Sequence, residues 1–477
     1  MAAVEPLSAP LAAHKTDDSL KGEATATTIS RWSDLHISTP AVVVTPKCEE
    51  EVVEAIRLAK SKSLTIVVGG GGHGTFVPVD ASTLYLDMKA FQSIDIDKDA
   101  GVVQFGGGVA TGEMLKRLTA NGLYTTLCDS NTVGAVGSLA GGGNSPHVGL
   151  HGYMVDNAVS FRVATANEEV IDVDAWSTGD KLALFNALCG AGQGHGVIVS
   201  ATMKVYPLTG LHLTDNKIWT RLMMFPPPAL ETALKAYLSL SPAPGSLYRQ
   251  LLFTRAPPGT PMAGSPIVLL STMYLGPATE AEKAASVLFA SDLTTAAAHI
   301  ETQMIDVTSI NNALEPVNVH GGLKSTNGAR LTKITPEMVT STFAKWLAIT
   351  DALPDAQRSL VSFQAFNPEV LEANGKSEPG KDKFLEARDR GFIMVVATWC
   401  TTAESNAKLI PYVDDVLQTC RKEDGATPRT IPNTMRYKEP LRNLFNEERI
   451  SELHRLKKCW DPEGLFWSPY VGAYRQE

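Results

Sequence analysis

Residues 69–74 of the chain, GGGGHG, combine a run of glycines with a single histidine. They follow the apolar stretch LTIVV (64–68), which is typical of a short buried strand. Successive glycines after a strand turn their backbone N–H groups toward one point, and such a nest binds an anion. We therefore expect this loop to bind the phosphate groups of a cofactor rather than to serve as a plain structural turn.

His73 lies inside this loop, with no bulky neighbour to block approach to its ring. A lone histidine is more often an ordinary surface or core residue. Beside a bound phosphate, however, a nucleophilic imidazole can attack an electrophilic carbon of the cofactor. The position of His73 therefore favours a covalent bond between its side chain and the cofactor.

The same loop matches G-x-G-x-x-G, the fingerprint of dinucleotide-binding βαβ units. In such a unit a helix follows the glycines and its N-terminus meets the phosphates. Here the helix-like segment EEEVVEAIRLAKSKS (49–63) precedes the strand, and the residues that follow the loop (75–80) are extended and include Pro78. The order of elements therefore excludes a Rossmann-type unit.

Two further glycine-rich stretches follow, VGAVGSLAGGG (133–143) and GAGQGHG (190–196). His151 and His195 lie near them and are candidates for contact with a cofactor or substrate, although a structural role is the commoner one for such residues. Between the glycine stretches, AVSFRVAT (158–165) and EEVIDVD (168–174) predict a hairpin.

The composition limits the class of protein. The chain has 477 residues, 44% of them apolar, and a net charge of −9, which fits a well-cored protein and argues against a nucleic-acid partner. The six cysteines form no CxxC pair, so we expect neither a disulfide framework nor a metal site. No long apolar run or secretory signal is evident, which predicts a cytoplasmic protein without a membrane span.

Three motifs in order carry a resemblance to a known family: IVVGGGGHG at 66–74, TVGAVGSLAGGG at 132–143, and GQGHGVIVSATMKVYP at 192–207. Together they resemble the FAD-linked oxidases of the vanillyl-alcohol oxidase superfamily (PCMH-type), and within it the berberine-bridge-enzyme-like branch. The tail RISELHRLKKCWDPEGLFWSP (449–469) is similar to that branch's C-terminal signature, although Gly464 replaces its usual Asn.

The resemblance implies an α+β fold: a two-subdomain PCMH-type FAD-binding domain and a substrate domain with a large antiparallel sheet covered by helices. We expect a flexible lead-in at 1–36, the FAD-binding domain at 37–208 and the substrate domain at 209–430. Residues 431–477 are expected to return to the FAD-binding domain. Segments such as PIVLLSTMYL (266–275, strand) and TPEMVTSTFAKWLAI (335–349, helix) fit this arrangement.

The resemblance also implies the residues around FAD. His73 is expected to bond the 8α-methyl of the flavin; Ser130 stands where many relatives have a second, cysteine link, so we expect no second link, and Cys128 is two residues out of register. The other positions expected to line the cofactor are Gly69, Gly70, Gly71, Gly72, Gly74, Thr75, Thr132, Val133, Gly134, Gly137, Ser138, Gly141, Gly142, Asp156, Gly196, Val197 and Ile198.

The resemblance further implies hydride transfer from a C–H beside O or N of a small organic substrate, such as a secondary metabolite, alcohol or amine, to flavin N5. Val133 stands where a small residue is associated with access of O2, which favours an oxidase that releases H2O2. The catalytic base is not evident. Tyr437 and Gln364 are the candidates for the substrate site. A flavin-dependent dehydrogenase, or a non-redox cyclase or isomerase on a retained FAD scaffold, are the alternatives; the oligomeric state is open.

Overall fold

A computed structural model of the chain describes residues 29–260, 262–377 and 382–471. The first half holds a small parallel sheet in the order β1-β3-β2, built from Val42–Val44, Thr83–Asp87 and Thr65–Gly69. Helix α1 (Glu49–Ser61) lies beside it and has three acids in its first turn, as the helix dipole favours. Its apolar residues recur at helical spacing and are buried: Val52, Val53, Ala55, Ile56 and Ala59.

A second, five-stranded antiparallel sheet adjoins the first, in the order β4-β5-β9-β7-β8. Its strands are β4 (Ile94–Asp97), β5 (Val102–Gly106), β9 (Val197–Lys204), β7 (Ala158–Ala164) and β8 (Val170–Asp174). A short pair, β6 (Leu123–Tyr124) with β10 (Tyr206–Pro207), lies nearby. The helices of this half are α2 (Thr111–Ala120), α3 (Ala135–Ala140), α4 (Val148–His151) and α5 (Gly179–Ala191).

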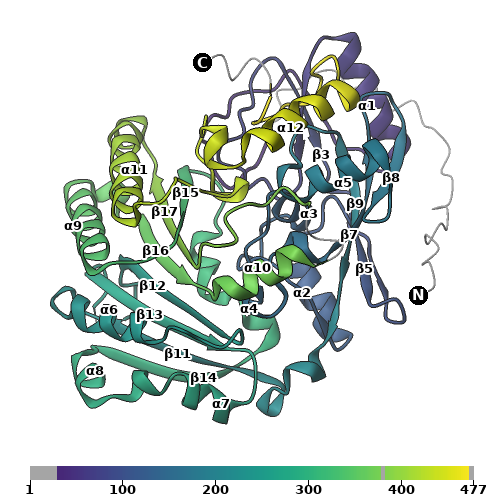
Figure 1. The fold of residues 1–477 in the computed structure, drawn as a ribbon. Helices are drawn as coiled ribbons and strands as arrows, with labels where there is room; N and C mark the ends of the chain where they lie inside the picture. The colour runs from purple at the N-terminus through teal and green to yellow at the C-terminus, as the bar shows by residue number, and fades with distance from the viewer. Residues whose placement is uncertain (1–28, 261, 378–381, 472–477) are drawn as a thin grey trace.

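The second half is built on a seven-stranded antiparallel sheet in the order β14-β11-β13-β12-β16-β17-β15. The strands are Lys217–Phe225 (β11), Leu247–Arg255 (β12), Pro266–Tyr274 (β13), His299–Asp306 (β14), Leu323–Leu331 (β15), Leu360–Ala365 (β16) and Phe392–Cys400 (β17). The helices are Leu230–Ser239 (α6), Ala278–Ala284 (α7), Ser291–Ala296 (α8), Pro336–Ala352 (α9), Pro368–Lys376 (α10) and Ala403–Asp424 (α11). Helices α6, α9 and α11 cover its outer face (Figure 1).

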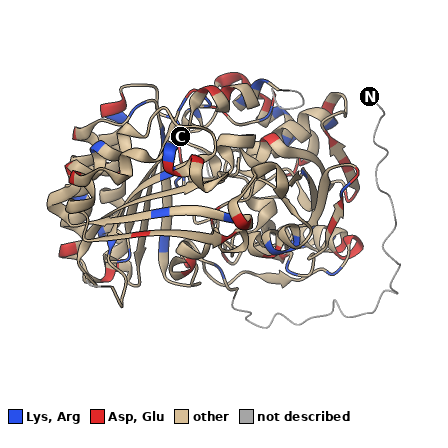
Figure 2. Cartoon of the chain, turned by 90° about the horizontal axis from the view of Figure 1, so that it is seen from below, with Lys and Arg blue, Asp and Glu red and all other residues tan. Residues whose placement is uncertain are grey.

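The two faces of this large sheet serve different cores, because successive side chains of a strand point to opposite sides. On β17, Met394 packs with the covering helices, whereas Ile393 packs into the core shared with the first half. The face that carries Ile393 is called the inner face below. Charged residues gather on peripheral helices and loops and are few on the strands of the large sheet (Figure 2).

Both ends of the described chain pack onto the first half. Helix α12 (Glu447–Trp460) is followed by a segment in which Phe466 forms a bridge with Ile66 of β2. At the other end, the expected lead-in at 1–36 is corrected in part: residues 1–28 lie outside the described residues, but Arg31 and Ser33 are buried. The reason is local, since Trp32 N donates to Gly72 O and anchors this segment on the glycine loop.

The α+β architecture with a large antiparallel sheet is confirmed, as are the 158–174 hairpin, the strand at 266–275 and the helix at 335–349. One expectation was incomplete: the glycine-rich stretch 133–143 contains the short helix α3. Within the described residues, no helix is long and apolar enough to span a membrane.

Candidate active site

His73 lies in an enclosed, aromatic setting. Its Nε2 is 2.8 Å from Thr132 Oγ1, and its ring stacks on Trp32 with centroids 5.2 Å apart. Burial, with the positive charges of neighbouring residues, lowers the pKa of His73 to about 3. The imidazole is therefore neutral near pH 7 and keeps the lone pair that a nucleophile needs. Because Nε2 is engaged with Thr132, Nδ1 is the ring nitrogen left to react.

Glycine is required where the first two loops meet. A Cβ built on Gly71 would overlap the backbone nitrogen of Gly134, so the loops could not approach this closely with any larger residue at position 71. This contact brings His73 next to the start of helix α3. The sequence-predicted residues Gly71, Thr132 and Gly134 are thus in one place.

The glycine loop is suited to an anionic ligand. Within the described part of the chain, the backbone N–H groups of residues 70–74 donate to no protein acceptor. Arg31, 5% exposed, donates from Nη2 to Gly74 O at 2.8 Å and adds a buried positive charge beside the loop. Unsatisfied amides next to a cation form a site for phosphates. On α3, a Cβ at Gly137 would meet open space, so a flat ring system has room beside this helix.

The third glycine region joins this site through a loop that the sequence analysis did not single out. A Cβ on Gly70 would meet Gly107 O at 2.9 Å, and a Cβ on Gly107 would meet Ile198 O at 2.7 Å. Loop 69–74 and strand β9 are thus linked through residue 107. Next to β9, His195 is fully buried and neither ring nitrogen has a hydrogen-bond partner among the described residues. Such an orphaned pair of nitrogens fits a missing ligand.

Two amides fix the loops after α3, one to the C-terminal segment and one to the large sheet. Asn433 Oδ1 accepts from Gly143 N at 2.7 Å, and its Nδ2 donates to Ser138 O at 3.1 Å. Asn144 Nδ2 donates to Gln364 Oε1 at 2.8 Å. Since Gln364 pairs in register with Ile393, it lies on the inner face of the large sheet. The inner face therefore looks onto the loops that surround α3.

A carboxylic acid and a phenol complete this cluster. Burial raises the pKa of Asp129, and burial together with the negative charge of Asp129 raises the pKa of Tyr248 well above its usual range. Tyr248 lies on strand β12 next to Gln364. A carboxylate with a raised pKa is a suitable proton acceptor, whereas a phenol with a raised pKa stays protonated and acts as a donor.

Several sequence-predicted residues have partners within the protein. Ser130 Oγ donates to Asn318 Oδ1 at 2.6 Å, and Ser138 Oγ lies 3.3 Å from Met154 Sδ. The Asp156 carboxylate is buried, accepts from Tyr153 N and forms an ion pair of 2.6 Å with Arg388, so it positions the turn η1 (Met154–Asn157).

Tyr437 stands apart from this cluster. It is 36% exposed and stacks on His36 at 4.5 Å, whereas Gln364 is buried among the inner-face residues. An exposed phenol lacks the enclosed setting that would make it a base. A catalytic Tyr437 therefore stays a sequence-based prediction, and Asp129 is the carboxylate that lies in the enclosed cluster with Tyr248.

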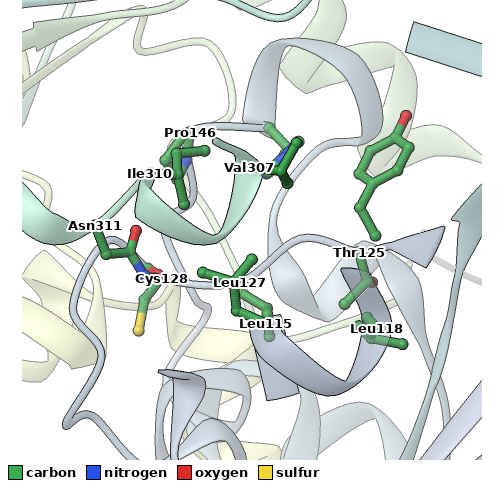
Figure 3. Close-up of a pocket in the computed structure, with 11 residues that line it drawn as sticks. Leu115, Leu118, Thr125, Leu127, Cys128, Pro146, Val307, Ile310 and Asn311 are labelled. Carbon is green, nitrogen blue, oxygen red and sulfur yellow. Dashed lines mark hydrogen bonds between the residues drawn. The ribbon is translucent and has the colours of Figure 1, made fainter. Parts of the chain in front are cut away.

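Cys128 lines a small apolar cavity of about 10 Å³ between the two halves (Figure 3), which has room for about one water molecule. Leu115, Leu118, Val307 and Ile310 form its walls. Burial raises the pKa of the Cys128 thiol, and its Sγ lies 3.1 Å from Thr111 Oγ1. The cavity is too small for a substrate and the thiol is held protonated. Among the described residues, no cluster of three or more metal-ligating side chains occurs.

Comparison with known proteins supports the same cofactor. A family model described as an FAD binding domain matches residues 40–174. The FAD-linked oxidoreductase hasG of Aspergillus fumigatus is 26% identical over 456 residues, 93% of this chain and 94% of that protein. Among solved structures, 6-hydroxy-D-nicotine oxidase from Arthrobacter nicotinovorans aligns with a TM-score of 0.75 and 20% identity, covering 92% of this chain and 94% of that one. The BBE-like 1 protein of Physcomitrella patens aligns with a TM-score of 0.73 and 18% identity, covering 90% and 91%.

The fold and the site together define an FAD-dependent oxidoreductase. The chain carries an FAD-binding domain, is similar along nearly its whole length to an FAD-linked oxidoreductase, and shares its fold with BBE-like 1 and with berberine bridge enzyme. The residues present fit FAD: the unsatisfied amides of the glycine loop suit its diphosphate, and the open side of α3 suits its ring system.

Sequence reasoning missed four groups of this site. Arg31 and Trp32 were assigned to the lead-in, and only their hydrogen bonds to the glycine loop reveal their place in the site. Asp129 stands directly before Ser130, and an acid beside a cofactor-lining loop was also visible. Tyr248 carried no signal, because only the sheet register brings it to Gln364.

Proposed function

We propose that this protein is an oxidase that carries FAD covalently on His73 and oxidises a C–H bond beside an oxygen or nitrogen of a small organic substrate. Bound FAD supplies a hydride acceptor, and O2 then accepts the electrons and yields H2O2. The observation that carries this proposal is the neutral, enclosed imidazole of His73 beside the unsatisfied amides of the glycine loop. Nδ1 is the nitrogen proposed to bond the 8α-carbon.

The proposal includes a single covalent link. Ser130 offers no thiol, and the Cys128 thiol is buried in an apolar wall with a raised pKa. A protonated, enclosed thiol is a poor nucleophile. We also propose residues 37–208 and 431–477 as the cofactor-binding part and residues 209–430 as the substrate part.

Asp129 is proposed to accept the O–H or N–H proton of the substrate as the hydride leaves. Tyr248 donates a hydrogen bond, and Gln364, tied to Asn144, orients the substrate on the inner face. Ile393 and Val395 lie on that same face and provide an apolar floor. Nicotine is an amine, so the shared fold with 6-hydroxy-D-nicotine oxidase supports a C–H beside nitrogen as one accepted type of substrate.

Turnover under air tests the proposal. The flavin-loaded protein is mixed with panels of small alcohols and amines, and oxidised product is compared with H2O2 by a peroxidase-coupled assay. One H2O2 per product is expected. Product formed with an artificial electron acceptor but without H2O2 would support the dehydrogenase instead. Product isomeric with its substrate, formed without loss of hydrogen, would support the non-redox alternative.

A further inference from the structure

Arg330 of strand β15 is a buried cation without a counter-ion. Its side chain is 2% exposed, and Nε, Nη1 and Nη2 all lack a hydrogen-bond partner among the described residues. In register, Arg330 pairs with Ile393, which in turn pairs with Gln364. Because directly paired residues point to the same side of a sheet, Arg330 lies on the inner face, in the same row as Gln364.

The neighbours of Arg330 do not neutralise it. The guanidinium lies 4.8 Å from the centre of the Tyr153 ring, and the buried Tyr153 hydroxyl is also without a partner in the described chain. The acids nearby serve other arginines: Asp156 pairs with Arg388 at 2.6 Å, and Asp424 lies 3.4 Å from Arg390. Asp389 acts on Arg330 through its charge, but its exposed carboxylate pairs with Arg390 at 3.5 Å.

A buried charge without a partner is strongly unfavourable, so a site of this kind calls for an anion. Burial lowers the pKa of Arg330 to about 9, which still leaves the guanidinium charged near pH 7. The unpartnered hydroxyl of Tyr153 offers a second donor on the ring that lies 4.8 Å from this guanidinium. A guanidinium with a neighbouring hydroxyl suits the two oxygens of a carboxylate.

We propose that Arg330 and Tyr153 bind a carboxylate group of the substrate, so that the substrate is a small hydroxy or amino compound bearing an acid. This inference rests on the proposed function. Arg330 and Gln364 stand two strand spacings apart, about 10 Å between backbones. The acid group is therefore held at one end of the inner face while the reacting C–H lies toward Gln364, Tyr248 and Asp129.

The test uses the flavin-loaded protein with acetate and benzoate as probes and acetamide and benzamide as neutral controls of the same shape. Binding is followed by the change in flavin absorbance and by the melting temperature. For the wild type, we expect the carboxylates to bind at least tenfold more tightly than the amides. Arg330→Met should remove this preference while keeping FAD, and Arg330→Lys should retain part of it.

Melting temperatures without ligand give a second measurement that needs no binding. Arg330→Met should melt at or above the wild-type temperature, because it removes an unpaired buried charge. The matched variant Arg388→Met should melt lower, because it leaves the buried Asp156 carboxylate without its partner.

Three results would overturn the inference. They are equal binding of carboxylates and amides by the wild type, an unchanged preference for carboxylates in Arg330→Met, and loss of FAD from both Arg330→Met and Arg330→Lys. The last result would assign Arg330 to the cofactor. A wild-type protein that retains no FAD would instead contradict the proposed function, so the two failures are distinguishable.

Discussion

In the proposed reaction, proton acceptance falls to the carboxylate of Asp129, because burial keeps the neighbouring phenol of Tyr248 protonated. Burial raises the pKa of Asp129, and the same low-polarity setting raises that of Tyr248. A raised pKa makes the Asp129 carboxylate a stronger proton acceptor than an ordinary aspartate. The division of roles comes from the environment rather than from residue type, since either side chain can serve as a base in another setting.

Asp129→Asn should lower kcat about 10²- to 10⁴-fold, the usual contribution of a positioned base. In the wild type, kcat/KM should fall on the acid side as Asp129 becomes protonated, at a pH above the usual aspartate pKa of about 3.9. Steady-state rates between pH 4 and 9 check both. Asp95→Asn, which changes an exposed carboxylate of strand β4, is the control. An unchanged rate in Asp129→Asn would assign the base elsewhere.

Val133 is the position at which access of O2 to the flavin can be tested. Its carbonyl accepts from Thr111 N at 2.9 Å, which fixes the backbone of the loop before α3. Val133→Leu enlarges the side chain without disturbing that bond. We expect the rate of reoxidation by O2 to fall about tenfold or more while anaerobic reduction by substrate is little changed; stopped-flow measurement of each half-reaction would show it. Equal slowing of both would point to a general distortion of the site.

At the scale of elements, the spacing of apolar residues along the chain predicts some helices and strands and does not predict others. Helix α1 and the 158–174 hairpin follow from apolar spacing and turn residues visible in the sequence. Helix α3 was missed because it is a single short turn-and-a-half of small residues between glycines, with too little length to show a helical period. Its burial against the surrounding core stabilises it, which is a tertiary effect.

The contact between the first two glycine loops makes a sharp prediction. Gly71→Ala would place a methyl group against the Gly134 backbone, so the loops should separate and FAD content after purification should fall at least tenfold. Gly210→Ala is the matched control, because a Cβ there meets nothing within 4 Å. The ratio of flavin to protein absorbance measures the effect. Full FAD content in Gly71→Ala would contradict the claim that FAD binding needs the close contact between Gly71 and Gly134.

The ion pair that holds η1 predicts a stability change. Asp156→Ala removes the buried carboxylate and leaves the largely enclosed Arg388 without its partner, and we expect a loss of about 3 kcal/mol in the free energy of unfolding. Asp172→Ala breaks an exposed pair with Arg162 and should cost about 1 kcal/mol or less. Urea denaturation of both variants checks the difference. Equal losses would show that the buried pair has no special role.

At the scale of the whole molecule, the site forms where the two halves meet. Loops around α3 provide one wall and the inner face of the large sheet provides the other, and the hydrogen bond between Asn144 and Gln364 joins them. Asn433 of the C-terminal segment holds the same loops at Gly143. The glycine motifs made the cofactor side predictable from sequence. The substrate side was not, because Tyr248, Gln364 and Arg330 are far apart in the chain and only strand register aligns them.

The most direct test of the account is whether the flavin stays attached to denatured protein. Wild-type holoprotein is precipitated with acid and washed, and its absorbance near the flavin bands is recorded beside that of His73→Ala and of the control His320→Ala. The ring centre of His320 lies 6.2 Å from that of His73. We predict yellow pellets for the wild type and His320→Ala, with all flavin in the supernatant of His73→Ala. Flavin released from the wild type, or retained by His73→Ala, would contradict the bond to this imidazole.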